Sequence, residues 1–274
     1  MVSPVLGAAE LVSRHALARS TRAVETSLER LATGKRINRA SDDPAGSVAV
    51  TNLKGDEREL QGRIEALLQE DAYLGARDGA QSVLSDLLIE LQGLVVTGAN
   101  RDALSDAERR GLQIEVDSIL QTIDHLSNTS RFKSEQILQG FSTSSLGRGT
   151  LTREAGDGEP ETIAFSLADL ARGGKLNLID GDTEAAQRAV TSAAGTISGS
   201  RAAIGARGQA VDAEIRAARK QLEETSKARS QIEDTDYARE TAELVRNQVL
   251  QSAALFATEL ASEQLRTLME GLLG

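Results

Sequence analysis

The sequence predicts a mainly α-helical fold, an elongated antiparallel helical rod or coiled-coil bundle with a short β-hairpin in mid-chain. Only 2% of the 274 residues are aromatic and only three are proline, a composition typical of long helices. Apolar residues also recur every seven positions over long stretches. Such stripes bury well only against other helices, which favours an extended bundle over a compact domain.

The first predicted helix covers residues 5–37 and ends at a break over 38–46. Asp43 is a favourable N-cap for the helix that follows, and Pro44 suits the first position of that helix. The apolar stripe of the first helix has members seven residues apart and one neighbouring position, namely Leu17, Val24, Leu31 and Leu28.

The second predicted helix covers 47–99, and only Gln81 interrupts the heptad column that runs along it. A capping-box pattern at 105–108 begins a third helix, which ends near Asn128. Glycines are scattered through the long helices, and each costs up to about 1 kcal/mol in a helix interior. We interpret them as points of close helix–helix packing; the alternative is a monomer that is only marginally stable until it assembles.

Residues 140–181 are rich in Gly, Ser and Thr, and apolar residues alternate with others at 162–167. This alternation predicts a β-hairpin with strands near 149–154 and 161–167. The heptad period returns over 182–233, and a last helix covers 237–272 after an acidic break. We expect the chain to fold back on itself, so that the terminal helices pair with each other and the long inner helices pair likewise.

Composition and charge exclude several classes of function. The net charge of −10 disfavours binding to a phosphate backbone, so no nucleic-acid partner is expected. The absence of Cys excludes a disulfide framework and a thiol nucleophile, and with only two His no metal or cofactor is expected. No run approaches eighteen consecutive apolar residues, so we expect no membrane span, and the start of the chain has no cleavable signal pattern.

Three segments carry a resemblance to a known family. Residues 28–46, LERLATGKRINRASDDPAG, are similar to the family pattern ERLSSGLRINSAKDDAAG. Residues 123–132, IDHLSNTSRF, are similar to IDRVSNQTQF, and residues 228–240 with 247–251 are similar to ARSRIEDSDYATE followed by ILQQ. The motifs occur in the same order and at the same ends of the chain as in the family. The sequence therefore resembles bacterial flagellin over about 1–140 and 182–274.

The resemblance implies a short flagellin without large outer domains and a division of the chain into five regions. These are an inner-core helix and linker at 1–46, rod helices at 47–139, the hairpin region at 140–181, a rod helix at 182–236 and an inner-core helix at 237–274. It further implies a secreted, extracellular filament subunit for swimming motility, exported by the flagellar type III apparatus. The alternative is a hook–filament junction protein, whereas catalysis is not expected.

Two groups of residues follow as candidates for function. The expected self-assembly residues lie on the terminal helices: Leu17, Val24, Leu28, Leu31, Val245, Val249, Phe256, Leu260, Leu265, Leu268 and Leu272. The expected joint residues lie at the two breaks: Arg36, Asn38, Asp42, Asp43, Glu233, Asp234 and Asp236. We interpret the acidic residues of both breaks as helix caps and solvated helix boundaries rather than metal ligands.

The resemblance also implies several partners. Besides copies of itself, these are the hook–filament junction and cap proteins and an export chaperone at the C-terminal helix. An innate immune receptor that senses some flagellins would contact positions matching Glu90, Leu94 and Glu115. Because the recognised flagellins carry Arg where this chain has Glu90, we expect only weak receptor activation.

Overall fold

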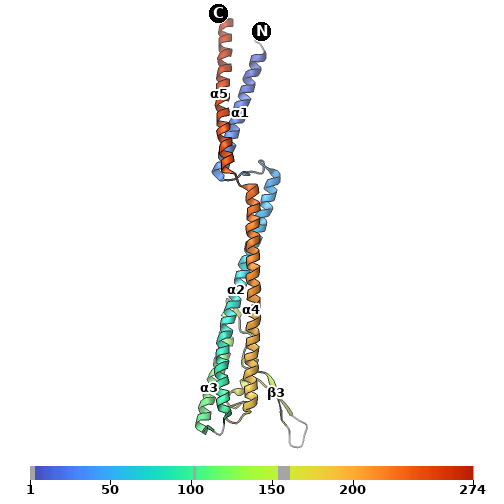
Figure 1. The fold of residues 1–274 in the computed structure, drawn as a ribbon, viewed down its shortest axis with the longest axis vertical. Helices are drawn as coiled ribbons and strands as arrows, with labels where there is room; N and C mark the ends of the chain where they lie inside the picture. The colour runs from blue at the N-terminus through green and yellow to red at the C-terminus, as the bar shows by residue number, and fades with distance from the viewer. Residues whose placement is uncertain (1–3, 101–102, 154–160, 274) are drawn as a thin grey trace. The chain divides into compact units, whose positions relative to one another are not determined.

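The computed structural model describes the backbone of residues 4–100, 103–153 and 161–273, and the described chain is mainly helical (Figure 1). Its helices are α1 (Pro4–Thr33), α2 (Pro44–Ala99), α3 (Asp106–Thr129), α4 (Thr183–Glu233) and α5 (Tyr237–Leu273), with a short 3-10 helix η2 (Leu167–Leu170). The strands are β1 (Arg131–Phe132), β2 (Glu135–Gln136), β3 (Gly149–Arg153) and β4 (Glu161–Phe165). The mainly α-helical prediction with a mid-chain hairpin is confirmed.

The chain forms two compact units, and each is described by itself. The terminal unit contains residues 4–62 and 219–273, and the central unit contains residues 63–218. In the terminal unit α1 and α5 pack side by side and run antiparallel (Figure 1). In the central unit α2 and α4 lie side by side, joined by the ion pair between Arg201 Nε and Asp78 Oδ1 at 2.8 Å.

The core of the central unit brings α2, α3 and α4 together with the segment that follows α3. Large side chains from every part are fully buried, among them Leu84, Leu91, Ile123, Leu138, Leu170 and Ile197. Gln113 of α3 ties down the glycine-rich middle of the chain. Its side-chain Nε2 donates to the carbonyl of Leu170 at 2.8 Å, and its Oε1 accepts from the amide of Leu178 at 2.8 Å. These two hydrogen bonds hold the glycine-rich segment against the apolar core.

The predicted hairpin is confirmed as β3 and β4, which pair antiparallel from Gly149 with Phe165 to Arg153 with Glu161. Gly149 is required there, because a Cβ on it would lie 2.3 Å from the ring of Phe165. A second hairpin, β1 with β2, was not predicted, since strands of two residues are too short to show an alternating pattern.

The turn of this second hairpin holds Lys133 at a φ of 56°, a conformation that costs a non-glycine residue free energy. Asn tolerates this conformation better than Lys. We therefore expect Lys133→Asn to stabilise the protein by about 0.5–1 kcal/mol, measured as a rise of about 1–4 °C in Tm. The matched control Ser134→Asn changes a neighbour without a positive φ and should give no gain. An equal rise for both variants would contradict the backbone explanation.

Helix α1 ends earlier than predicted, at Thr33 rather than at residue 37. Gly34 adopts a φ of 71°, and its amide donates to the carbonyl of Arg30 at 2.9 Å, which is how glycine commonly ends a helix. The glycine at position 34 is the sequence signal for this earlier end. Ile37 is instead buried beside the start of α2, within the terminal unit.

The interpretation of these helix glycines as points of close packing within the chain holds at Gly98, which lies close to Leu178, and is wrong at the other nine. A Cβ added to Gly55, Gly62, Gly75, Gly79, Gly93, Gly195, Gly199, Gly205 or Gly208 would meet no atom within 4 Å. We expect Gly79→Ala to stabilise the dilute protein by about 1 kcal/mol, seen as about 2–4 °C in Tm. Gly98→Ala in the same helix is the control, because its Cβ would lie 2.9 Å from Leu178 Cδ1. A loss of stability in Gly79→Ala would contradict this assignment.

By length and composition alone, α2 is long and apolar enough to cross a membrane, which the absence of a long apolar run in the sequence did not predict. An 18-residue window of this helix has a mean hydropathy of 1.4, and 28% of the window is buried within the protein. The same helix supplies Leu84, Leu88 and Leu91 to the core of the central unit. Packing within the protein therefore accounts for part of this apolar character.

Candidate functional site

The seam between α1 and α5 is small and polar. Among the described side chains of α1, the buried positions are Ser13, Ser20 and Ser27, spaced by seven and only 8%, 8% and 3% exposed. The hydroxyls of Ser13 and Ser20 donate to carbonyls of their own helix at 2.9 and 3.0 Å. Among the side chains described on α5, the buried positions are Glu240 and Ala254. Because serine and alanine bury little apolar area, this seam contributes little hydrophobic stabilisation.

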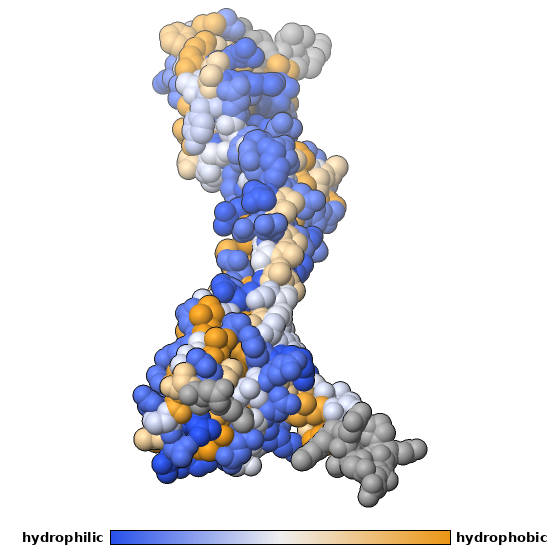
Figure 2. Space-filling view, turned by 60° about the horizontal axis from the view of Figure 1, so that its bottom comes forward, coloured by the Kyte–Doolittle hydropathy of each residue, from blue (hydrophilic) through white to orange (hydrophobic). Residues whose placement is uncertain are grey.

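Several large apolar side chains of the same two helices are exposed to solvent. Phe256 is 77% exposed and Val249 is 63% exposed, although a soluble helix pair would normally bury such residues. Among the described side chains, the other exposed large aliphatic residues on these helices are Leu11, Val12, Leu28, Val245, Leu250, Leu255 and Leu260. We call these residues, together with Val249 and Phe256, the terminal apolar face. Apolar surface is visible on the helices of the protein in Figure 2.

The predicted self-assembly residues fall into three groups. Leu28, Val245, Val249, Phe256 and Leu260 belong to the terminal apolar face. Leu17, Val24 and Leu31 are half-buried at the edge of the seam. The side chains of Leu265, Leu268 and Leu272 lie outside the described part of the structure. The most deeply buried positions of α1 are Ser13, Ser20 and Ser27, which were not predicted even though their seven-residue spacing is visible in the sequence.

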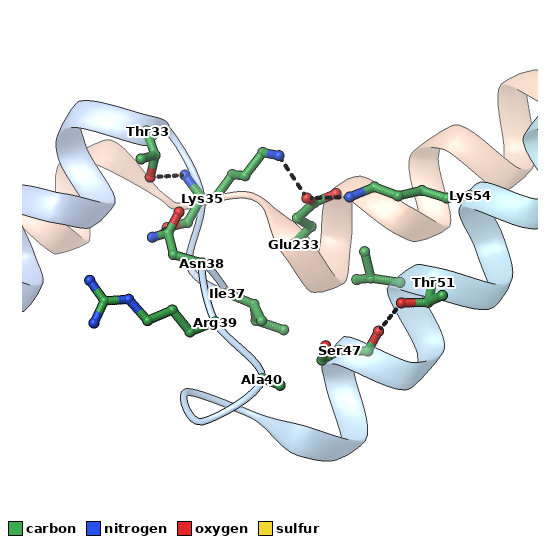
Figure 3. Close-up of a pocket in the computed structure, with 11 residues that line it drawn as sticks. Thr33, Lys35, Ile37, Asn38, Arg39, Ala40, Ser47, Thr51, Lys54 and Glu233 are labelled. Carbon is green, nitrogen blue, oxygen red and sulfur yellow. Dashed lines mark hydrogen bonds and ion pairs between the residues drawn. The ribbon is translucent and has the colours of Figure 1, made fainter.

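A buried carboxylate organises the predicted joint. Glu233 at the end of α4 is 2% exposed, and its Oε1 accepts from Lys54 Nζ at 2.8 Å and from Lys35 Nζ at 3.0 Å (Figure 3). Its Oε2 accepts from Arg229 Nη1 at 2.7 Å. The expectation that Glu233 lies at a solvated helix boundary is thus wrong. Nothing in the sequence singled out Lys54 or Arg229 as its partners.

Three cations stabilise the ionised form of this carboxyl. Burial alone would raise the pKa of Glu233, but the hydrogen bonds from Lys54, Lys35 and Arg229 outweigh it and lower the pKa to about 2. Arg229 is in turn paired with Glu57, whose Oε1 lies 2.9 Å from the guanidinium Nε. The charges therefore connect the start of α2 with the end of α4.

Backbone hydrogen bonds join the two breaks at the same place. The amide of Arg36 donates to the carbonyl of Glu233 at 2.7 Å, and its Nη2 donates to the carbonyl of Ile232 at 2.8 Å. Lys35 forms an antiparallel bridge with Asp234, and Asn38 Nδ2 donates to the carbonyl of Lys35 at 2.9 Å. Segments 34–38 and 232–235 are thus tied together by main-chain bonds within the terminal unit.

The remaining acidic residues of the joint accept hydrogen bonds from nearby backbone amides. Asp42 Oδ2 accepts from the amides of Asn38 and Arg39 at 3.0 and 2.8 Å, and these bonds lower its pKa. Asp43 Oδ1 accepts from the amide of Gly46 at 2.9 Å and caps α2. Asp236 Oδ1 accepts from the amides of Ala238 and Arg239 at 3.0 and 3.2 Å and caps α5. The capping interpretation is confirmed at Asp43 and Asp236 but is wrong at Asp42, which closes the turn before α2.

The central unit carries exposed large apolar residues of its own, among the described residues Leu68, Val83, Ile89 and Val96 on α2 and Ile114 on α3. Glu90 and Glu115 are exposed on the same two helices, whereas Leu94 is half-buried against the core. The three positions matched to an immune-receptor contact therefore include one side chain that packing already engages.

Comparisons with known families match both ends of the chain. The model described as the bacterial flagellin N-terminal helical region matches residues 7–143. The model described as the bacterial flagellin C-terminal helical region matches residues 187–270.

Individual relatives are similar over shorter stretches. Polar flagellin F of Vibrio parahaemolyticus is 29% identical over 148 residues, which are 54% of this chain and 39% of that protein. A flagellin of Listeria innocua is 28% identical over 166 residues, 60% of this chain and 56% of the relative. The match to the Treponema maltophilum flagellar filament 30.7 kDa core protein is 26% identical and covers 43% of this chain and 41% of that one.

The chain thus matches roughly half, or less, of the length of these relatives. Among solved structures, the crystal structure of Bacillus cereus flagellin is similar with a TM-score of 0.40 and 20% identity, covering 58% of this chain and 88% of that one.

Proposed function

Because the chain belongs to the bacterial flagellin family, we propose that it is a structural subunit that polymerises into the extracellular flagellar filament for swimming motility. One observation supports this most directly. The α1–α5 pair buries serines in its seam and leaves the terminal apolar face uncovered. Fully covering a side chain such as Phe or Leu stabilises a contact by about 1.5–3 kcal/mol, so covering this face by further copies would favour assembly strongly.

The joint around Glu233 would hold the terminal unit together in each subunit. Its residues connect the segment after α1 with the end of α4 through both ion pairs and backbone bonds. Changes in the packing of this joint are our candidates for the switching that supercoils a filament. Only residues 144–186 lie between the two family matches, in keeping with a short flagellin that lacks large outer domains.

Removing either terminal helix tests the assignment. Variants lacking residues 1–30 or 245–274, seeded with filament fragments in vitro, are expected not to elongate, because each loses half of the α1–α5 pair. Electron microscopy of the full chain should show long filaments. Normal growth of either truncated variant would overturn the proposal, and a full chain that never forms long filaments would favour the hook–filament junction alternative.

Other partners follow from the same surfaces as proposals. The apolar residues of α5 would be covered by an export chaperone before type III export, and the filament ends would meet the junction and cap proteins. The α2–α3 region would meet the innate immune receptor only weakly, because Glu90 places a negative charge there. In a reporter-cell assay Glu90→Arg should raise the response, with Glu59→Arg, exposed elsewhere on α2, as the matched control. A potent response to the unmodified protein would contradict this expectation.

A further inference from the structure

A pocket of about 470 Å³ lies beside Glu233, between the α1–α2 connection and the first turns of α2. Its apolar side is formed by Ile37 and Val50, and its polar side by Lys35, Lys54, Ser47 and Thr51. Figure 3 shows the two lysine side chains approaching Glu233 from the α1–α2 connection and from α2. All of these residues belong to the terminal unit.

The positive charge at this pocket exceeds the negative charge. Lys35 and Lys54 share one carboxylate oxygen, Oε1 of Glu233, while the second oxygen is already engaged by Arg229. An ammonium group has three N–H donors, and each lysine donates one of them to this oxygen. The two side chains remain 45% and 40% exposed, so their other donors are accessible to a ligand.

Neighbouring groups add to the same chemistry. The hydroxyl of Ser47 has no hydrogen-bond partner among the described residues, and Ser47 lines the pocket. The guanidinium of Arg39 is also at the pocket, but it is paired with Glu29 at 3.0 Å. Asp42 is engaged by backbone amides, as described above, so it does not compete for the lysines.

We propose that this pocket binds a small free oxyanion of the phosphate or sulfate class, held between the ammonium groups of Lys35 and Lys54. A tetrahedral oxyanion offers several acceptor oxygens and can bridge two ammonium groups by charge-assisted hydrogen bonds. Because the chain carries a net charge of −10, such a site would stand out locally against a surface that repels anions. The proposal does not depend on polymerisation.

Titration of the dilute full chain with inorganic phosphate tests the site, with chloride at matched ionic strength as the reference and calorimetry as the readout. Saturable binding is expected, with a Kd on the order of 1 mM. Lys54→Gln should weaken it by about tenfold or more, since it removes one of the two ammonium groups. Ser47→Ala, which leaves the ion pairs intact, should weaken it by a smaller factor.

Arg229→Gln is the matched control, because it removes an equally close partner of Glu233 that does not line the pocket. It should leave phosphate affinity within about twofold. Circular dichroism identifies any variant that fails to fold. If Lys54→Gln fails to fold, the phosphate affinity of Ser47→Ala tests the site. Phosphate acting no differently from chloride, or binding Lys54→Gln and Ser47→Ala unchanged, would overturn the site.

A carboxylate from a second copy has the same chemistry and would compete only in the polymer. Phosphate binding is therefore scored in dilute protein, where no second copy is present, and its absence there would overturn the assignment to a free ion. Filament formation itself is scored separately by microscopy, so failure of the pocket and failure of the proposed function give different results.

Discussion

Replacing Val249 and Phe256 together by serine is expected to raise the critical concentration for polymerisation by about 100-fold. Both side chains are exposed, at 63% and 77%, so their removal costs the isolated chain little. In a polymer that covers them, their loss would remove about 3 kcal/mol per subunit, and each 1.4 kcal/mol corresponds to a factor of ten. Sedimentation of seeded filaments over a range of protein concentrations measures the effect.

The matched control changes exposed polar positions of the same helix, Gln248→Ser with Ser252→Ala. It should leave the critical concentration within a few-fold of the original, since neither side chain is apolar. The Tm of dilute protein should be nearly unchanged for both double variants. If the polar control impaired assembly as much as the apolar variant, the terminal apolar face would not be what drives polymerisation.

Neutralising Glu233 is expected to destabilise the terminal unit by about 3 kcal/mol, because Lys35, Lys54 and Arg229 would remain together without their shared anion. Glu233→Gln tests this with little change of volume. Thermal unfolding followed by circular dichroism, together with proteolysis near residues 34–40, should report the loss. Asp234→Asn is the control, since that exposed carboxylate accepts from the Ser230 hydroxyl rather than from a cation.

The stability of the folded protein should fall as the carboxyl of Glu233 becomes protonated. The pKa of Glu233 is about 2 in the folded protein against 4.5 ordinarily, so the folded state favours the ionised form. Its contribution, about 3 kcal/mol at most, is fully present above about pH 4.5 and is lost as the pH falls toward 2. Glu233→Gln should therefore lose less stability than the original protein across that window. Parallel stability curves for the two proteins would show that this carboxyl is not the responsible group.

Helix positions could be predicted well because they depend on local signals. The caps at Asp43 and Ser105 and the heptad columns placed the helices within a few residues of their observed bounds. The hairpin of β3 and β4 followed from alternation. These signals act between neighbours in the sequence, so a single chain displays them without reference to its partners.

The pairing seam and the joint could not be predicted, for different reasons. A heptad column tells which residues share a helix face, but it does not tell which face a given neighbour covers. In α1 the most deeply buried positions are serines, while Leu17 and Leu31 of the predicted stripe are only half-buried. Glu233 looked like one acid among several at a helix end, and its burial depends on Lys54, which is 179 residues distant in sequence.

The pairing of α1 with α5 has a kinetic consequence. Thr21 and Gln251, which bond across this pair at 3.1 Å, are 230 residues apart along the chain. Closing so long a loop carries a large entropic penalty, so these contacts should form late, after local helices and hairpins have shortened the effective separation. A newly emerging molecule would thus keep both of its ends unjoined until nearly all of it is available, which leaves a time window in which the ends can meet other molecules first.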